Sequence, residues 1–254
     1  MNFSITNKIK NKKLRQFTRR PFAFIRDEVR HSLYPLFWLH PTSYIWTNFN
    51  KLFRNSHSQF QEDLIIDKLL KYKENGFYVD IGANDPVELS NTIRFYRKGW
   101  TGINVEPNVL VYNRLCAERK KDINLNIGIA QEKGEFDFYR INPDVLSTFD
   151  KQTADDFVAE GYKLVEVIKV STLSLENLIS TYATDKKIDF LSVDTEGIDL
   201  IVLKSNNWAK FRPTVVIVEI DKGGDEIIEY LNEKNYELKF KNHCNAIFKD
   251  KNVY

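Results

Sequence analysis

Four acidic residues in this chain follow apolar segments that have the length and composition of buried strands. They are Asp80, Glu106, Asp194 and Glu219. Because the carboxyl ends of parallel strands meet at one edge of a sheet, these side chains can converge although they lie far apart in sequence. Carboxylates at such an edge can accept hydrogen bonds from ligand hydroxyls, take protons as general bases, or cap the next helix through its N-terminal amides.

The segment after the first of these acids has the composition of a nucleoside-binding turn. Gly82, Ala83 and Asn84 follow the strand and form a turn small enough for a ligand to approach the backbone. Of the three glycines in the dinucleotide motif G-x-G-x-x-G, only Gly82 is present, so a pyrophosphate is disfavoured. S-adenosylmethionine has a ribose and an adenine but no phosphate. The turn therefore favours this methyl donor, with Asp80 near its charged end and Glu106 accepting both ribose hydroxyl hydrogen bonds.

The elements that must position these residues follow from hydrophobic periodicity and turn residues. The predicted strands cover 78–81, 103–105, 123–129, 135–141, 165–170, 188–193, 215–220, 236–241 and 245–249, and the predicted helices cover 61–73, 108–121, 171–182, 197–204 and 225–235. The strands at 188–193 and 215–220 are almost continuously apolar, which is typical of central strands covered on both faces. With right-handed crossovers, this order predicts an α/β fold: a doubly wound, mostly parallel sheet with an antiparallel C-terminal edge.

Residues 142–163 have no sustained hydrophobic period. They contain Asn142-Pro143-Asp144 and Gly161, which are typical of turns, and the run Ser147, Thr148 and Phe149. This segment is predicted to be an excursion over the strand ends. It is either a lid or wall of the substrate site or a solvated connector with local hydroxyl caps.

Several ordered motifs carry a resemblance to a known family. They are S-Q-F-Q-E-D-L at 58–64, D-I-G-A-N at 80–84, S-N-T at 90–92, G-W-x-G-I-x-V-E-P at 99–107, D-x-E-G at 194–197 and F-R-P-T-V-V-I-V-E at 211–219. Over about residues 56–249, the chain resembles the FkbM family of S-adenosylmethionine-dependent methyltransferases. One departure is Pro86, where many relatives have glycine; proline removes an amide donor, so the turn is expected to hold the cofactor slightly differently, and the role of Asp85 stays open.

The resemblance implies a Rossmann-like class I methyltransferase fold and an acceptor that is a carbohydrate hydroxyl, in a nucleotide-linked sugar or a surface polysaccharide precursor. The residues assigned to binding S-adenosylmethionine are Asp80, Gly82, Ala83, Asn84, Asn91, Thr92, Glu106 and Asp194.

Methyl transfer to an alcohol also requires a general base, because a sugar hydroxyl is too weak an acid to ionise at neutral pH. The catalytic candidates are Asp194, Glu196, Glu219 and His243. His57 is a further histidine, but a lone histidine is more often a surface or core residue than a catalyst. The four candidates could instead bind Mg²⁺ or Mn²⁺. No compact metal motif such as H-E-x-x-H is present, so we assign no metal ligands and leave a divalent cation open.

The first 55 residues differ in charge from the rest of the chain. Residues 1–54 contain 11 Lys and Arg against two acidic residues, whereas the remainder contains 26 against 33. Aromatic residues are interleaved among the basic ones. We expect residues 1–55 to be a helical or partly disordered appendage that packs on the domain, joins a second subunit or lies against an anionic membrane surface. Residues 56–254 are predicted to form the methyltransferase domain, without a nucleic-acid partner.

Size and composition limit the class of protein. A chain of 254 residues that is 43% hydrophobic can form one sizeable α/β core plus an appendage. Cys116 and Cys244 cannot form a disulfide framework, and no leader or apolar run of about 20 residues is evident, which predicts a cytoplasmic protein with at most peripheral contact at the inner membrane face. Two alternatives stay open: a non-catalytic Rossmann-like module whose basic head binds membrane or nucleic acid, and an NAD-dependent sugar oxidoreductase, which the glycine pattern disfavours.

Overall fold

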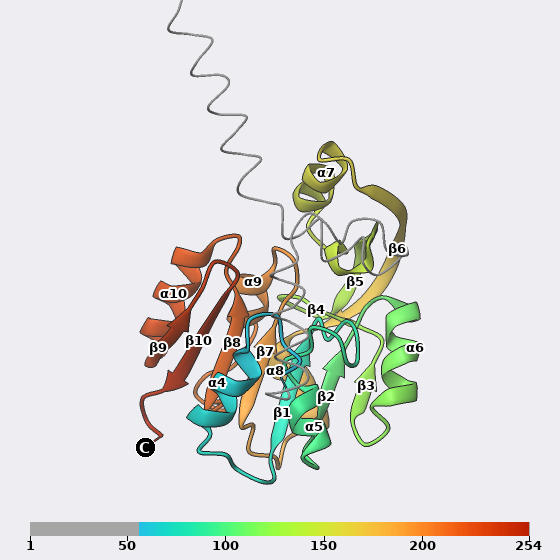
Figure 1. Ribbon diagram of the computed structural model, residues 1–254. Coiled ribbons are helices and arrows are strands. Elements are labelled where there is room, and N and C mark those ends of the chain that lie inside the picture. Colours follow the sequence, from blue (N-terminus) through green and yellow to red (C-terminus); the bar gives the residue numbers. More distant parts are fainter. Residues whose placement is uncertain (1–55, 254) are drawn as a thin grey trace, which may run out of the picture. The chain divides into compact units, whose positions relative to one another are not determined.

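The computed structural model describes residues 56–253. The predictions made for the basic aromatic segment 1–55 therefore fall outside the described residues. Within 56–253 there are two β-sheets, and helices pack on both faces of the larger one (Figure 1). No helix in this part of the chain is both long and apolar enough to cross a membrane.

The larger sheet has seven strands in the order β3-β2-β1-β7-β8-β10-β9. Their bounds are β1 Phe77–Ile81, β2 Thr101–Val105, β3 Ile123–Leu125, β7 Phe190–Val193, β8 Val215–Glu219, β9 Tyr236–Lys241 and β10 Asn245–Asp250. Strands β3, β2, β1, β7 and β8 pair in parallel, whereas β10 is antiparallel to both β8 and β9. The predicted mostly parallel sheet with an antiparallel C-terminal edge is confirmed.

The side chains of β1 show how this sheet separates two apolar layers. Successive residues of a strand point to opposite faces. Phe77, Val79 and Ile81 pack with α8, α9 and α10, whereas Tyr78 packs with α4 and α5 on the other face. The helices are α4 Glu62–Leu69, α5 Ile93–Arg97, α6 Val109–Glu118, α7 Lys151–Ala159, α8 Leu175–Tyr182, α9 Asp199–Lys204 and α10 Gly224–Glu233, with a 3₁₀ turn η2 at Asp144–Leu146. Both faces are thus covered, which explains the continuous apolar runs in the central strands.

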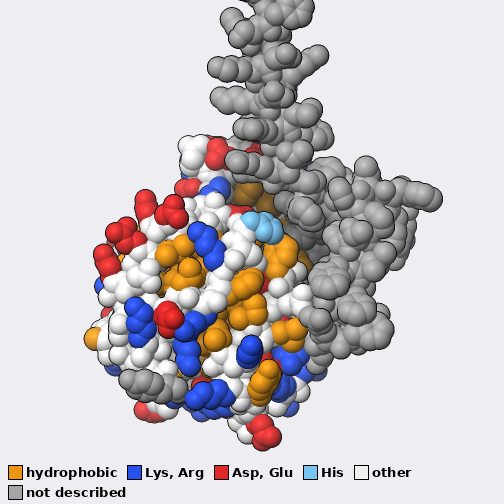
Figure 2. All heavy atoms as spheres, turned by 60° about the vertical axis from the view of Figure 1, so that its left-hand side comes forward, with side chains coloured by type: hydrophobic (Ala, Val, Ile, Leu, Met, Phe, Trp, Pro, Cys, Tyr) orange, Lys and Arg blue, Asp and Glu red, His pale blue; other side chains and the backbone are white. Residues whose placement is uncertain are grey.

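Strand β9 is an edge of the sheet. It carries Glu237, Lys239 and Lys241, and charged side chains on an edge strand discourage pairing with another chain. Figure 2 shows this side of the molecule, where basic side chains are interspersed with apolar ones.

The prediction of a single strand at 123–129 is wrong. The chain forms β3, which pairs with β2, and then β4 (Gly128–Ile129), which belongs to a second sheet of order β4-β6-β5. Between them, the Asn126 side-chain amide donates to the backbone oxygens of Glu106 and Pro107. These bonds bind the chain to the segment after β2 and end the pairing of β3, so that β4 can join β6. The other strands of this sheet are β5 Gly134–Asn142 and β6 Lys163–Leu173.

Two predicted boundaries also require correction. Residues 142–163 contain η2 and the helix α7, which begins where the Asp150 carboxylate accepts a hydrogen bond of 3.0 Å from the Thr153 amide. At nine residues, this helix is too short for its period to stand out in the sequence. Helix α8 does not begin at 171, because β6 continues to Leu173 and Ser174 caps the helix by accepting from the Asn177 amide.

Candidate functional site

The turn after β1 brings three strand ends together. The amides of Gly82 and Ala83 both donate to the backbone oxygen of Val105, at 3.0 and 3.1 Å, and the amide of Asp194 donates to the backbone oxygen of Ile81 at 3.0 Å. Gly82 has a φ of +77°, and a Cβ added there would lie 1.8 Å from the backbone oxygen of Asp194. Only glycine fits this close approach, so the turn 82–84 is fixed against the ends of β2 and β7.

Glu106 follows β2 and is only 6% exposed. Its Oε2 accepts from the backbone amide of Asn84 at 2.9 Å, and its Oε1 accepts from the backbone amide of Asn108 at 2.8 Å. Burial raises the pKa of Glu106 to about 7, although both amides act to lower it. Since each carboxylate oxygen has a second lone pair, Glu106 can still accept hydrogen bonds from ligand hydroxyls.

Asn84 provides a second acceptor beside this carboxylate. Its φ is 47°, in the left-handed region, and its side-chain oxygen is buried without a hydrogen-bond partner in the described part of the chain. A buried acceptor without a donor is unfavourable unless a ligand or water supplies one. The pair Asn84 and Glu106 therefore fits a ligand that carries hydroxyl or ammonium donors, as S-adenosylmethionine does.

Asp80, Thr92 and Asn91, which were also predicted to bind the cofactor, take part in internal hydrogen bonds. The Thr92 hydroxyl donates to Oδ2 of buried Asp80 at 2.8 Å, and the side-chain amide of Asn91 donates to the Ser192 hydroxyl at 3.3 Å. Burial raises the pKa of Asp80, and the Thr92 hydroxyl and the Arg119 guanidinium oppose that rise. These side chains hold the segment behind the turn 82–84.

Asp194, Glu196 and Glu219 form a cluster in which one carboxylate oxygen from each residue lies within 4.8 Å of the others. Burial raises the pKa of Glu219 well above its usual range, and the charges of Asp194 and Glu196 raise it further. Three carboxylates at this spacing can act as a general base, and their oxygens are also ligands suited to a divalent cation. The structure thus brings together three of the four predicted catalytic residues.

The fourth, His243, lies outside this cluster. It is in the turn between β9 and β10, where its ring packs edge-on against the Phe60 ring at a centroid distance of 4.7 Å. The next residue, Cys244, accepts a backbone hydrogen bond of 2.7 Å from Ile220. The position of His243 is thus explained by packing of this turn.

Asp199 was not singled out from the sequence, although it shapes the carboxylate cluster. Its Oδ1 accepts from the Thr195 amide at 2.9 Å and its Oδ2 from the Gly197 amide at 3.2 Å. The turn between these amides contains Glu196 at φ 55°, a conformation that is uncommon for a residue with a side chain. The signal that could have indicated this role is an acidic residue at the start of α9, two positions after Gly197.

The excursion 142–163 contacts the rim of the site. The Thr148 hydroxyl donates to the backbone oxygen of Glu196 at 3.0 Å, and the Lys222 ammonium, beyond the end of β8, donates to the Thr153 hydroxyl at 2.7 Å. Figure 1 shows α7 and the antiparallel strands β5 and β6 beyond one end of the larger sheet. These contacts show that the segment packs on the rim of the site, and its role toward a substrate stays a prediction.

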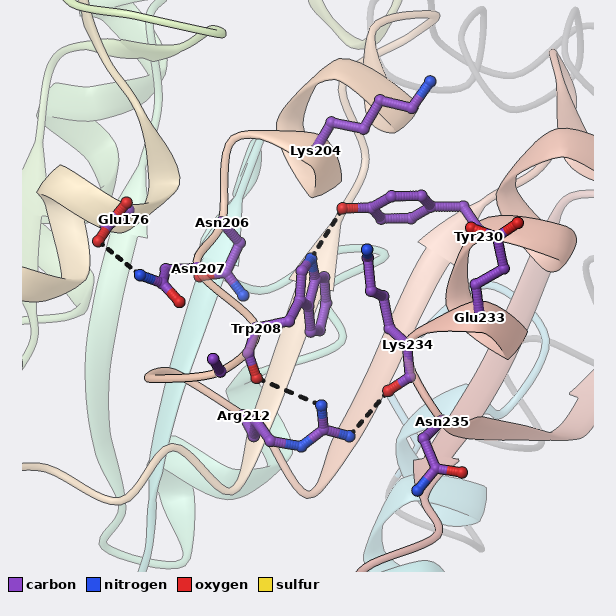
Figure 3. A pocket seen from close by; sticks show the side chains of 11 residues that line it. Glu176, Lys204, Asn206, Asn207, Trp208, Arg212, Tyr230, Glu233, Lys234 and Asn235 are labelled. Atoms are coloured by element: carbon purple, nitrogen blue, oxygen red, sulfur yellow. Dashed lines mark hydrogen bonds between the residues drawn. The ribbon is translucent and has the colours of Figure 1, made fainter.

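A hollow of about 650 Å³ lies at the other end of β8 (Figure 3). Arg212, which lines the hollow, lies three residues before β8, whereas Glu219 of the carboxylate cluster is the last residue of that strand. The hollow and the cluster are therefore at opposite ends of β8. Several polar groups of the hollow bond to one another: Glu176 accepts from Asn207 at 3.0 Å, and the Trp208 indole donates to the Tyr230 hydroxyl at 3.1 Å. It contains none of the predicted site residues.

The chain matches a known protein family over much of its length. Residues 80–238 match the family described as Methyltransferase FkbM domain, which is more than half of the chain. The matched range includes the turn 82–84, Glu106 and the whole carboxylate cluster. No curated protein matches the chain.

Proposed function

The chain belongs to the FkbM family of methyltransferases, and we propose that it transfers a methyl group from S-adenosylmethionine to a sugar hydroxyl. The observation that carries this proposal is the contact between the turn 82–84 and the carboxylate cluster. A Cβ at Gly82 would clash with the backbone of Asp194, and the Asp194 carboxylate belongs to the cluster. A methyl donor on the turn and a proton acceptor on the cluster are therefore neighbours.

Residues of the turn and of the second strand bind the donor. S-adenosylmethionine supplies an electrophilic methyl group on a sulfonium. Glu106 accepts hydrogen bonds from the two ribose hydroxyls, and the unpartnered oxygen of Asn84 accepts one from a further donor group of the ligand. Gly82 lets the ligand lie close to the backbone. These residues fix the position of the donor's methyl group. Holding donor and acceptor together in reacting geometry can contribute roughly 7 to 11 kcal/mol.

The carboxylate cluster takes the proton of the sugar hydroxyl as the new C–O bond forms. Burial raises the pKa of Glu219, and the charges of Asp194 and Glu196 raise it further, so the cluster favours uptake of one proton. A carboxylate with a raised pKa is a stronger base as long as it is ionised. Because Asp194 is exposed, it can pass the proton on to solvent.

The charges at the rim favour an acceptor sugar that is neutral where it reacts. Asp194, Glu196, Glu219 and Asp221 all lie at or just beyond the ends of β7 and β8, with Lys222 as a nearby cation in the described part of the chain. A phosphate close to the reacting hydroxyl would be repelled by these carboxylates. This supports a neutral sugar unit, whose nucleotide or polysaccharide remainder extends away from the cluster.

The test is a turnover assay with the full chain, S-adenosylmethionine and a panel of neutral sugars, polysaccharide precursors and nucleotide-linked sugars. The expected result is S-adenosylhomocysteine formation with gain of one methyl group on the acceptor. Thermal melts with S-adenosylhomocysteine and with NAD form the matched comparison, because a ligand that binds only the folded state raises its melting temperature. Stabilisation by NAD alone would favour an oxidoreductase, and binding without turnover on any acceptor would favour a non-catalytic module.

A further inference from the structure

Arg119 is a fully buried arginine immediately after α6. Its Nη1 donates to the backbone oxygen of Pro86 at 2.9 Å, and its Nη2 donates to the hydroxyls of Tyr78 and Thr92, both at 2.8 Å. Its Nε donates to Asp122 at 3.1 Å, which supplies the counter-charge. One guanidinium thus joins β1, the middle of the segment 82–92 and the start of α5.

We propose that Arg119 is a positioning residue for the cofactor: it holds the loop 82–92 in the shape that receives S-adenosylmethionine. This inference rests on the proposed function only for the identity of the ligand. The loop connects β1 to α5 and includes the turn 82–84. Arg119 itself does not face the ligand, because its side chain is 1% exposed and its donors are directed to protein groups.

The contacts of Arg119 fall at the points that determine the loop's path. Pro86 lies two residues after Asn84, whose amide bonds to Glu106, so a fixed Pro86 carbonyl limits the movement of that amide. Thr92 ends the loop, and its hydroxyl receives a bond from Arg119 while donating to Asp80. The middle and the C-terminal end of the loop are therefore linked to one rigid group, which is also bonded to Tyr78 of β1.

This arrangement is compatible with proline at position 86. Proline has no amide hydrogen, but its carbonyl remains an acceptor, and that carbonyl is the group that Arg119 binds. The ring of Tyr96 lies 4.8 Å from the guanidinium carbon, which gives the planar group a fixed orientation. A loop ordered before binding loses less conformational entropy when the ligand arrives.

Lysine cannot reproduce these contacts although it keeps the charge. An ammonium presents its three donors from one atom, whereas the guanidinium presents five donors in a planar fork. One nitrogen cannot reach Pro86, Thr92 and Asp122 together in the geometry that Arg119 uses. Arg119→Lys therefore releases the loop without leaving Asp122 as an unpaired buried charge.

The experiment compares Arg119→Lys with Arg212→Lys in the full chain. Arg212 is a matched control: it forks onto Asp250 at 3.0 and 2.7 Å and donates to backbone oxygens, and it lies in the hollow beyond the other end of β8. Binding of S-adenosylhomocysteine is measured by calorimetry well below both melting temperatures. We expect Arg119→Lys to weaken binding about tenfold or more and Arg212→Lys to change it by less than about twofold.

Two further readouts separate positioning from general destabilisation. Arg119→Lys is expected to raise KM for S-adenosylmethionine about tenfold while kcat at saturation stays within about threefold, because a bound ligand restores the loop. Amide hydrogen exchange is expected to accelerate in 82–92 and not in β8. If Arg119→Lys does not fold, Thr92→Val is used instead. It removes the hydrogen bond between Arg119 and the Thr92 hydroxyl and is also expected to weaken binding.

Unchanged affinity in Arg119→Lys, or an equal loss in Arg212→Lys, would overturn the inference. If instead the wild-type chain fails to bind S-adenosylhomocysteine, the cofactor assignment itself is wrong. Because no acceptor enters these measurements, an incorrect sugar assignment does not affect them.

Discussion

The affinity for S-adenosylhomocysteine should rise with pH, because Glu106 must be ionised to accept both ribose hydroxyls. Its two carboxylate oxygens already accept from the amides of Asn84 and Asn108, and burial raises its pKa to about 7. A protonated carboxyl group carries a hydrogen on one oxygen and loses an acceptor site there. Below pH 7, binding must therefore release a proton, and affinity falls as the pH is lowered.

The size of the effect follows from the fraction of ionised Glu106. With a pKa of about 7, about one molecule in eleven is ionised at pH 6 and about ten in eleven at pH 8. The Kd should therefore decrease about tenfold between pH 6 and pH 8, or by about 1.4 kcal/mol in binding free energy. Most of this change lies below pH 7.

Calorimetry on the wild-type chain and on Glu106→Gln measures this dependence. The ligand's own groups titrate in both proteins, so the difference between the two pH profiles isolates Glu106. At pH 6, binding to the wild-type protein should release close to one more proton to the buffer than binding to Glu106→Gln does. Titrations in buffers of different ionisation enthalpy measure this number. Identical pH slopes for the two proteins would refute the assignment of Glu106 to the ribose.

Three other predictions concern the turn and the carboxylate cluster. Asp194, Glu196 and Glu219 are each changed to the matching amide, and the variant that lacks the general base should lose about 10² to 10⁴-fold in single-turnover rate. Its affinity for S-adenosylhomocysteine, measured by calorimetry, should change little. Near-native turnover in all three variants would show that none of these residues is the base. Gly82→Ala should abolish cofactor binding because its Cβ meets a backbone oxygen at 1.8 Å, whereas Gly223→Ala, at φ +67° with no atom within 4 Å, tests the strain of a positive φ alone. EDTA should leave turnover unchanged if the cluster acts as a base, and a loss that Mg²⁺ restores would assign the cluster to a cation.

The sequence predicted those parts of the site that depend on local pattern. Glu106 and Glu219 lie at strand ends because apolar runs define the strands and the parallel arrangement brings their ends to one edge. Gly82 was recognisable because a tight turn after a strand requires a residue without a side chain. Such features depend on neighbours within a few positions.

The parts that were missed depend on contacts between distant segments. Arg119 lies 33 residues from Pro86 and 41 from Tyr78, and no local pattern distinguishes it from an exposed arginine at a helix end. Likewise, the division of 123–129 between two sheets depends on the pairing of β4 with β6, more than 40 residues away. Short segments take the conformation that tertiary contacts require.

The pH dependence of stability should oppose that of cofactor affinity. The pKa of Glu106 is about 7 in the folded protein and 4.5 for an ordinary glutamate, so between these pH values the folded state binds more protons than the unfolded chain. Stability of the ligand-free protein must then decrease as the pH rises from 4.5 to 7, with Glu219 adding a change of the same sign. Hydroxyl donors of the cofactor favour the ionised form of Glu106 and so recover part of this loss. Thermal melts should consequently give a lower melting temperature at pH 8 than at pH 6 without ligand, but a larger increase on adding S-adenosylhomocysteine at pH 8. A ligand-induced increase in melting temperature that was larger at pH 6 would show that ionisation of Glu106 does not favour ligand binding.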